Sequence, residues 1–371
     1  MQRRQFFLKT AVLSVSASAI GGLQTSQAQT CPPLAPAPIP STGTGTGINA
    51  VEAIKALRIP TGPYAGAYEI APNGLSNWYF TNLGLIAIVQ YLNGPDLDTY
   101  IRSYLDLYLS KLEPNMSIRD VHFPFGRVNT SNFTLVLADS DDSYAATTLT
   151  LAARYLRASQ NWAWWDQNKA RLKDIAYRNI ATAIKANGLT SVFQSPRSQT
   201  NNAGYLMDNC EVYRGLTDFA LLLRERGEPA DATYYESFAK NISSALATLF
   251  SMSNNGFRFA DLANQTETTF YPGTTCQVFP QVFGVTPLAP YYDRAWNFFN
   301  LNSTGWEKGT IDPYPWAVLG LAAALRGQTA LAQAQLASME KTFAISRPLM
   351  TINELGFYQR IKSVLAGRSD V

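Results

Sequence analysis

The chain has 371 residues, of which 46% are hydrophobic, 12% aromatic and 15% charged. This composition supports a large hydrophobic core and excludes a disordered chain, which needs excess charge and few aromatic residues. With one histidine and three cysteines, the sequence also excludes a histidine-rich metal centre and a scaffold held by many disulfides.

The formal net charge of +3 comes from the N-terminal segment, where Arg3, Arg4 and Lys9 stand without an acidic residue. The sequence after residue 28 carries as many basic as acidic residues, 27 of each. A neutral chain has no general field that attracts phosphate backbones or anionic membranes. We therefore expect no nucleic-acid partner and no stable membrane insertion. The partner is expected to be uncharged, or charged and held by local ion pairs.

Residues 1–28 are typical of an export signal. Arg3 and Arg4 are followed by Phe-Leu-Lys, which resembles bacterial twin-arginine signals. The apolar run 11–23 is interrupted by serines and glycines and is too short to span a bilayer. We predict a twin-arginine-type signal peptide over 1–28 and a Pro/Gly-rich linker over 29–48, and hence a periplasmic or secreted protein. An N-terminal amphipathic anchor is the alternative. In an oxidising compartment, Cys210 and Cys276 either form a disulfide or remain buried thiols.

Beyond residue 48 the dominant pattern is helical, in pairs of apolar-periodic segments separated by short Gly, Pro or Asn breaks. The predicted helices cover residues 78–92, 97–112, 142–158, 164–187, 209–226, 230–250, 291–300, 313–326, 329–343 and 352–365. The stretch 251–288 is predicted to be more irregular, and strand alternation is confined to short pieces such as 257–260.

One member of each pair is apolar on nearly all sides, and the other carries charges on one face. The segment 83–92 (LGLIAIVQYL) is of the first kind, and 100–112 (YIRSYLDLYLSKL) is of the second. A helix that is apolar all round is buried, and an amphipathic helix covers it. The repeat predicts an all-α, single-domain (α/α)6 toroid of inner and outer helices over residues 49–371. An open α-solenoid is the alternative.

Acidic and aromatic residues precede the predicted inner helices. Since the inner helices of a toroid all point the same way, these segments are expected to surround one mouth. Two carboxyl groups can act as acid and as base or nucleophile, and flat rings stack on pyranose faces, so the pattern favours sugar chemistry. The candidate catalytic residues are Asp141, Asp142, Asp208, Glu211 and Glu69. The candidate substrate-binding residues are Asp139, Tyr144, Trp78, Tyr205, Tyr213, Arg214, Asp312, Tyr314, Trp316 and His122.

Helix capping is the alternative explanation for each acidic residue, because Asp is a favoured N-cap and acids are stabilised near the positive end of the helix dipole. Asp312 followed by Pro313 is typical of a cap. The cluster of Asp139, Asp141 and Asp142 holds more carboxylates than one cap needs, and their repulsion favours the protonated form that a general acid requires.

No dinucleotide fingerprint, Gly-rich phosphate loop or metal-ligand spacing is present in the sequence. We therefore expect no cofactor and no metal ion.

The segments 139–145 (DSDDSYA) and 208–214 (DNCEVYR) resemble motifs of the six-hairpin glycosidase superfamily, the α/α-toroid glycoside hydrolases, and within it glycoside hydrolase family 8. The first is similar to that family's Asp-rich start of an inner helix, and the second to a segment that ends in an aromatic residue and Arg. Family 8 places its acid Glu at the start of the first inner helix, where this chain has Asn77. Glu69 or the aspartate cluster would then supply the acid.

We predict an exported, monomeric glycoside hydrolase that acts on a polysaccharide or oligosaccharide by carboxylate acid/base catalysis. Asp141 or Asp142 would be the proton donor or would stabilise a subsite, Asp208 would activate water, and Glu211 would hold Arg214. A polysaccharide lyase on the same fold would instead use His122, Arg127, Arg197, Asn201, Asn202, Tyr205 and Arg214. A non-catalytic glycan-binding or envelope polysaccharide assembly protein is the third possibility.

Overall fold

The computed structural model describes residues 47–72, 74–193 and 201–368. The predicted signal peptide, the predicted linker up to residue 46 and Arg197 lie outside these ranges. Within the described ranges, no helix is both long and apolar enough to cross a membrane.

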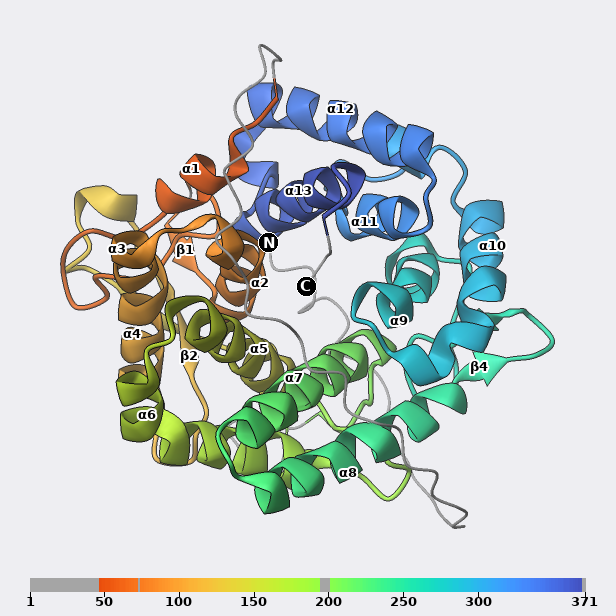
Figure 1. Cartoon of the computed structure of the whole chain (residues 1–371). Helices are drawn as coiled ribbons and strands as arrows, with labels where there is room; N and C mark the ends of the chain where they lie inside the picture. Colours follow the sequence, from red (N-terminus) through yellow and green to blue (C-terminus); the bar gives the residue numbers. More distant parts are fainter. Residues whose placement is uncertain (1–46, 73, 194–200, 369–371) are drawn as a thin grey trace.

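Inner and outer helices alternate around a common axis (Figure 1). The inner helices in the described part of the chain are α2 (Trp78–Ile88), α5 (Asp142–Ser159), α7 (Leu206–Glu225), α9 (Phe279–Val282), α11 (Val318–Leu325) and α13 (Ile352–Leu365). The outer helices are α1 (Ala50–Lys55), α4 (Ser103–Lys111), α6 (Trp162–Ile175), α8 (Pro229–Ala247), α10 (Tyr292–Asn302) and α12 (Thr329–Ile345). The short helix α3 (Gly94–Asp96) and a π-helical segment (Leu97–Arg102) lead into α4.

The inner helices form a closed ring. Contacts join α2 to α5, α5 to α7, α7 to α9, α9 to α11, α11 to α13 and α13 back to α2. The all-α toroid predicted from the sequence is confirmed, and the open solenoid is excluded. In this order α7 and α13 are three positions apart and therefore face each other across the axis (Figure 1).

The two kinds of helix differ in burial as their sequences predict. In the inner helix α11, every residue from Val318 to Ala324 is buried. In its outer neighbour α12, only Ala332, Gln335 and Met339 are buried. The hydrophobic effect thus places the uniformly apolar helices in the ring and leaves the polar faces of the outer helices in water.

Glycines let neighbouring inner helices approach closely. A Cβ atom on Gly356 of α13 would lie 2.9 Å from the Cα of Gly84 on α2. A Cβ atom on Gly215 of α7 would lie 2.5 Å from the carbonyl oxygen of Ala146 on α5. A side chain at these positions would force the helices apart.

Three short strands, which the sequence pattern does not predict, lie next to the starts of α2 and α5. They are β1 (Leu75–Ser76), β2 (Arg119–His122) and β3 (Thr134–Leu137), paired antiparallel with β2 in the centre. In their register, Leu75 lies opposite His122 and Arg119 opposite Leu137. A separate hairpin is formed by β4 (Phe250–Ser251) and β5 (Gly256–Phe257).

The fourth inner segment falls in the stretch predicted to be irregular. It consists of a π-helical turn (Phe270–Thr274), a 3-10 turn (Thr275–Val278) and α9. Pro272, Gly273 and Pro280 break the helical periodicity there, yet all three are buried in the ring. Cys276 of this segment and Cys210 of α7 are both free buried thiols.

Candidate functional site

The first turns of α2, α5 and α7 are connected by hydrogen bonds. Asn77, the N-cap of α2, donates from Nδ2 to the hydroxyl oxygen of Tyr144 on α5 at 2.6 Å. Tyr79 of α2 donates from its hydroxyl to Oε1 of Glu211 on α7. These bonds place the starts of the three helices at the same end of the ring.

The starts of the other inner helices are joined in the same way. The hydroxyl groups of Tyr314, just before α11, and Thr351, just before α13, lie 2.8 Å apart. The N–H of Ala317 donates to Oε2 of Glu354 at 2.6 Å. The ring of Tyr271, in the fourth inner segment, stacks on Trp316 with 4.5 Å between centroids. Since the N–H of Ile352 also donates to the carbonyl of Ile70 ahead of α2, both groups of helices begin at one common mouth.

Asp120 of β2 lies behind the starts of α2 and α5. Its Oδ2 accepts hydrogen bonds from Nδ2 of Asn77 and the hydroxyl of Tyr144, both at 2.7 Å, and its Oδ1 accepts from the N–H of Trp78. Burial, and next the charge of Asp139, raise the pKa of Asp120 well above its ordinary value, and the three donors oppose this shift. Asp120 thus keeps its proton at pH values where an exposed aspartate has lost it.

Asp139 stands at the mouth, ahead of α5. Its Oδ1 is buried and makes no hydrogen bond within the described residues. The neighbouring hydroxyl of Tyr144 has its pKa raised by burial and then by the charges of Asp120 and Asp139. Asp139 and Asp120 therefore both act on the buried hydroxyl of Tyr144, which donates its hydrogen bond to Asp120.

Replacing Asp139 by Asn is expected to change how stability depends on pH. Because the pKa of Asp120 is raised in the folded state, folding binds a proton, and stability falls as pH rises from the unfolded pKa towards the folded one. Removing the charge of Asp139 lowers the folded pKa of Asp120. The loss of unfolding free energy as pH rises through this range should therefore be smaller in the variant than in the parent protein, as measured by denaturant unfolding at a series of pH values.

The exposed Asp166 on α6 provides the matched control for this experiment. Its side chain pairs with Lys169 at the surface, so Asp166→Asn should leave the pH dependence as in the parent protein. An Asp139→Asn variant that shows the parent's slope would contradict the assigned coupling between the two carboxyl groups.

Asp141 and Asp142 are engaged in the architecture of the α5 start. The Oδ1 of Asp142 accepts from the N–H of Ser143 at 2.8 Å, and its Oδ2 accepts from the hydroxyl of Thr190 at 2.7 Å. Asp141 is the N-cap residue of α5, but its side chain makes no capping hydrogen bond. Burial raises the pKa of the Tyr108 hydroxyl on the outer helix α4, the hydrogen bond with Thr148 opposes this shift, and the charge of Asp141 adds to it. Asp142 therefore stabilises the start of α5, and Asp141 lies close to the outer helix α4.

Glu69 and His122 lie in the loops and strands beside the mouth. Oε2 of Glu69 lies 2.9 Å from Nε of Arg127, and its Oε1 accepts from the N–H of Gly74. Burial raises the pKa of Glu69, whereas Arg127 and the Gly74 N–H oppose this shift. His122 is half-buried on β2, opposite Leu75. Glu69 therefore holds the loop before α2 by an ion pair with Arg127.

Asp312 positions two aromatic residues at the start of α11. Its Oδ1 accepts from the N–H of Tyr314 at 2.9 Å, and its Oδ2 accepts from Nε1 of Trp316 at 3.3 Å. Trp316 has a φ of 53°, in the left-handed region that bulky residues rarely occupy. Such strain persists only where surrounding contacts impose it, and it concentrates at functional sites.

The other predicted binding residues fall in two groups. Trp78 is fully buried, and its Nε1 donates to the carbonyl of Arg119, which makes it a core residue between the inner and outer helices. Tyr205, the residue before α7, and Tyr213, within α7, are half-buried.

Asp208, Glu211 and Arg214 follow one another at intervals of three residues along α7, so Glu211 neighbours both of the others, which are themselves about 120° apart around the helix. The opposite helix α13 repeats the arrangement, with Glu354 in its first turn and Arg360 six residues later. Asp208 and Glu354 are both buried, at 3% and 2% exposure. The ring thus holds two buried carboxylates in the first turns of opposite inner helices.

Neither Glu354 nor Asp120 is among the site residues predicted from the sequence. Glu354 stands in the first turn of the last inner helix. A search for acidic residues at the start of every inner helix would therefore have found it. Asp120 lies on a strand of only four residues, too short for an alternating pattern, so no comparable signal existed.

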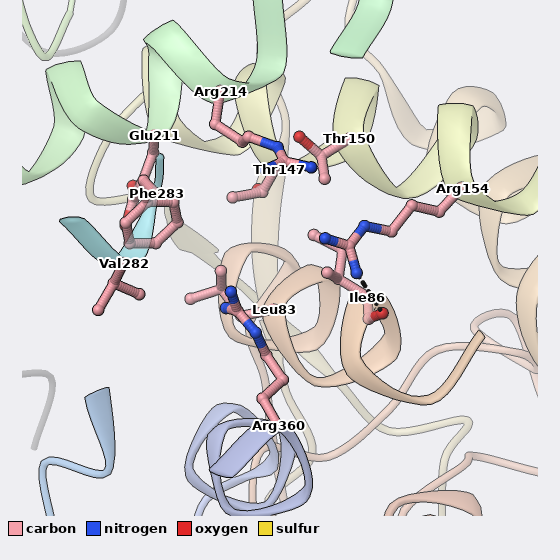
Figure 2. A pocket seen from close by; sticks show the side chains of 10 residues that line it. All are labelled: Leu83, Ile86, Thr147, Thr150, Arg154, Glu211, Arg214, Val282, Phe283 and Arg360. Atoms are coloured by element: carbon pink, nitrogen blue, oxygen red, sulfur yellow. Dashed lines mark hydrogen bonds between the residues drawn. The ribbon is translucent and has the colours of Figure 1, made fainter. Parts of the chain in front are cut away.

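A cavity on the ring axis lies below the mouth (Figure 2). Its lining residues, which come from α2, α5, α7, the end of α9 and α13, are Leu83, Ile86, Thr147, Thr150, Arg154, Glu211, Arg214, Val282, Phe283 and Arg360. Glu211 belongs to both the mouth and the cavity, because its Oε1 accepts from Tyr79 above. In the described ranges, no group of three or more His, Cys, Asp or Glu residues is placed to hold a metal ion.

Comparisons with known proteins detect a shared fold. No protein-family model and no curated protein sequence matches the chain. A glycosidase variant in complex with glucose has a TM-score of 0.57 and 12% identity, over 86% of this chain and 96% of its own. The wild-type form of a glycosidase gives the same values. A rhamnosidase from Klebsiella oxytoca with rhamnose bound has a TM-score of 0.59 and 14% identity, over 88% of this chain and 65% of its own. The chain therefore has the fold of these glycosidases, and the resemblance to family 8 stays a prediction.

Proposed function

We propose that the protein is a glycoside hydrolase whose active site is the mouth of the toroid. The observation that carries the proposal is the pair of buried carboxylates, Asp208 and Glu354, in the first turns of opposite inner helices. Glycoside hydrolysis uses two carboxyl groups that flank the scissile bond. The fold shared with glycosidases supports the same chemistry.

The hydrogen bonds around Glu354 suit a carboxylate that remains ionised. Its Oε2 accepts from the N–H of Ala317, and its Oε1 accepts from Nδ2 of Asn353 at 3.1 Å. Donors directed at both oxygens favour the charged form. We assign Glu354 as the base or nucleophile and Asp208 as the proton donor, in place of the water-activating role predicted for Asp208 from the sequence.

The aromatic side of the mouth provides a sugar platform in this proposal. Trp316 and Tyr271 are stacked, and Tyr314 packs edge-on against Trp316 at 5.2 Å. Aromatic faces bury the apolar face of a pyranose ring. Asp139, with its buried Oδ1, lies near the start of α5 and would accept a sugar hydroxyl.

The proposal is tested by incubating the purified protein with a panel of poly- and oligosaccharides. Release of reducing ends without an ultraviolet-absorbing product is the expected result. Product absorbance in the unsaturated-uronide band would identify a lyase instead. Saccharide binding with no turnover across the panel would favour the non-catalytic glycan-binding alternative. Export remains a prediction from residues 1–28 and is tested separately by cell fractionation.

Replacing Trp316 by Ala should weaken substrate binding. Loss of the platform is expected to raise KM about tenfold and to change kcat less, because stacking holds the sugar in the ground state as well as in the transition state. Steady-state kinetics on the best substrate of the panel measures both constants. Trp162 on the outer helix α6 is the control, since Trp162→Ala should leave KM unchanged. Equal effects of the two substitutions would rule out a platform at Trp316.

A further inference from the structure

Asp139 is a buried carboxylate that lacks a hydrogen-bond donor on one of its oxygens. The residue is 7% exposed, and its Oδ1 is buried without a hydrogen-bond partner among the described residues. Asp142 of the same cluster, in contrast, accepts hydrogen bonds from Ser143 and Thr190. Buried carboxylates are normally paired or hydrogen-bonded, because removing their charge from water is costly. The donor for Oδ1 is therefore expected to come from a ligand.

The position of Asp139 in the chain brings it next to the proposed catalytic site. It shortly precedes Asp142, the first residue of α5, whose carboxylate accepts from the hydroxyl of Thr190. The N–H of Thr190 in turn donates to Oδ1 of Asn209 at 2.8 Å, and Asn209 directly follows Asp208 in the first turn of α7. Asp139 thus belongs to the part of the mouth that adjoins Asp208.

Asp120 is the carboxyl group that interacts electrostatically with Asp139, and it is the more buried of the two, at 0% exposure. Its Oδ2 accepts from Asn77 and Tyr144, and its Oδ1 accepts from the N–H of Trp78. Burial raises the pKa of Asp120, and the charge of Asp139 adds to this rise. When two carboxyl groups repel each other, the more buried one keeps its proton. Asp120 is therefore the neutral member of the pair and Asp139 the ionised one.

The other titratable groups around Asp120 leave this division unchanged. The outer helix α4 contributes the hydroxyls of Tyr104 and Tyr108, which keep their protons because burial raises their pKa values. The hydroxyl of Tyr144 on α5 keeps its proton for the same reason. All three hydroxyls are uncharged, so Asp139 is the charged neighbour that acts on Asp120.

An ionised carboxylate can accept hydrogen bonds but cannot donate one. We propose that Asp139 is a specificity-determining residue, whose carboxylate accepts a hydrogen bond from one hydroxyl of the sugar unit at the mouth while Asp120 carries the proton of the pair. The substrate class is then a sugar with a free hydroxyl at that position. A site built to bind a hydroxyl rejects the analogue that lacks it, since the buried acceptor would stay unpaired. The inference rests on the proposed function, because it presupposes a sugar at the mouth.

Calorimetric titration of the purified protein tests the contact without requiring turnover. D-glucose, D-galactose, D-mannose, L-rhamnose and D-xylose are compared first, and the sugar that binds most tightly is selected. Derivatives of this sugar, each with one hydroxyl replaced by fluorine, are then titrated, because fluorine is similar in size to a hydroxyl but cannot donate a hydrogen bond. At least one derivative should bind about 30-fold more weakly than the sugar itself.

Asp139→Asn assigns this discrimination to its residue. The variant keeps the size of the side chain but lacks the charged acceptor, so the preference for the sugar over that derivative should fall from about 30-fold to less than about threefold. Asp166→Asn on the surface of α6 is the control and should discriminate as the parent protein does. Parental discrimination in Asp139→Asn, at an unchanged unfolding temperature, would overturn the inference. Failure of all five sugars to bind would overturn it as well.

Infrared difference spectra locate the proof that a merely structural role would not give, namely the proton of the pair. Above about pH 6 exposed carboxyl groups are ionised, so a remaining C=O stretching band reports a buried protonated carboxyl. Asp120→Asn should lack the band that the parent protein shows. Asp139→Asn should retain it and lose it at a lower pH than the parent. A band that disappears in Asp139→Asn and persists in Asp120→Asn would refute the inference, because Asp139 would then be a donor.

The inference and the proposed function fail in different ways. Hydrolysis of glycosides by a protein whose sugar binding does not depend on Asp139 would retain the glycosidase and reject the specificity role. Discrimination that depends on Asp139, without hydrolysis of any glycoside, would retain the sugar contact and reject the glycosidase.

Discussion

Replacing Asp208 by Asn, or Glu354 by Gln, is expected to lower kcat by about 10³-fold without unfolding the protein. Each change keeps the size and most of the hydrogen-bonding capacity of the side chain but removes its ability to carry the proton or the charge that hydrolysis needs. The Gln variant can still accept the N–H of Ala317 through its amide oxygen. The kinetics should be measured on the natural glycoside, with the unfolding temperature recorded in parallel.

The two variants should differ with activated substrates. A good leaving group needs no protonation, so Asp208→Asn should recover most of its activity on an aryl glycoside with an acidic phenol. Glu354→Gln should remain inactive on the same substrate, because the attack on the sugar is still impaired. The matched control is Glu236→Gln on α8, where Glu236 pairs with Arg224 on the protein surface. This control should be as active as the parent.

Two results would refute the assignment. Near-parental kcat in both variants would show that the pair is not catalytic. Equal losses for Asp208→Asn on natural and activated substrates would show that Asp208 is not the proton donor, and would direct attention to Asp139 and Asp120 near the start of α5.

Substituting Gly215 by Ala is expected to have the largest effect on stability. The new Cβ would lie 2.5 Å from the carbonyl oxygen and 2.7 Å from the Cα of Ala146, and both are backbone atoms that move only with α5. Such overpacking costs about 3 kcal/mol. Ala gains about 1 kcal/mol over Gly in helix propensity. The net loss in the free energy of unfolding should therefore be about 2 kcal/mol, measured by denaturant titration.

The same substitution at Gly94 is the matched control. A Cβ on Gly94, the first residue of α3, would meet no atom within 4 Å. Gly94→Ala should change the free energy of unfolding by less than about 0.5 kcal/mol. If Gly215→Ala were as stable as the parent, α5 and α7 would have room to separate, and close packing would not define the mouth between them.

The comparison of α2 and α11 with α4 and α12 explains why the fold class follows from the sequence. Whether a helix is apolar on all sides or on one face can be determined from its own sequence. A helix that is apolar on all sides is buried, and a helix with one apolar face packs over it. The fourth inner segment, Phe270–Val282, escaped this reasoning because its prolines and glycine divide it into short turns. Its place in the ring depends on its neighbours, α7 and α11.

The roles of the acidic residues show what only the tertiary structure decides. Asp139, Asp141 and Asp142 are nearly adjacent in the chain, yet the first lies beside Asp120 and the third is bound to Thr190. Glu354, 146 positions after Asp208, stands in the first turn of the helix on the opposite side of the ring. The sequence alone establishes that carboxylates and aromatic rings precede inner helices that point the same way. Which of them share the mouth depends on how each helix is rotated about its own axis, and contacts between residues distant in the chain set that rotation.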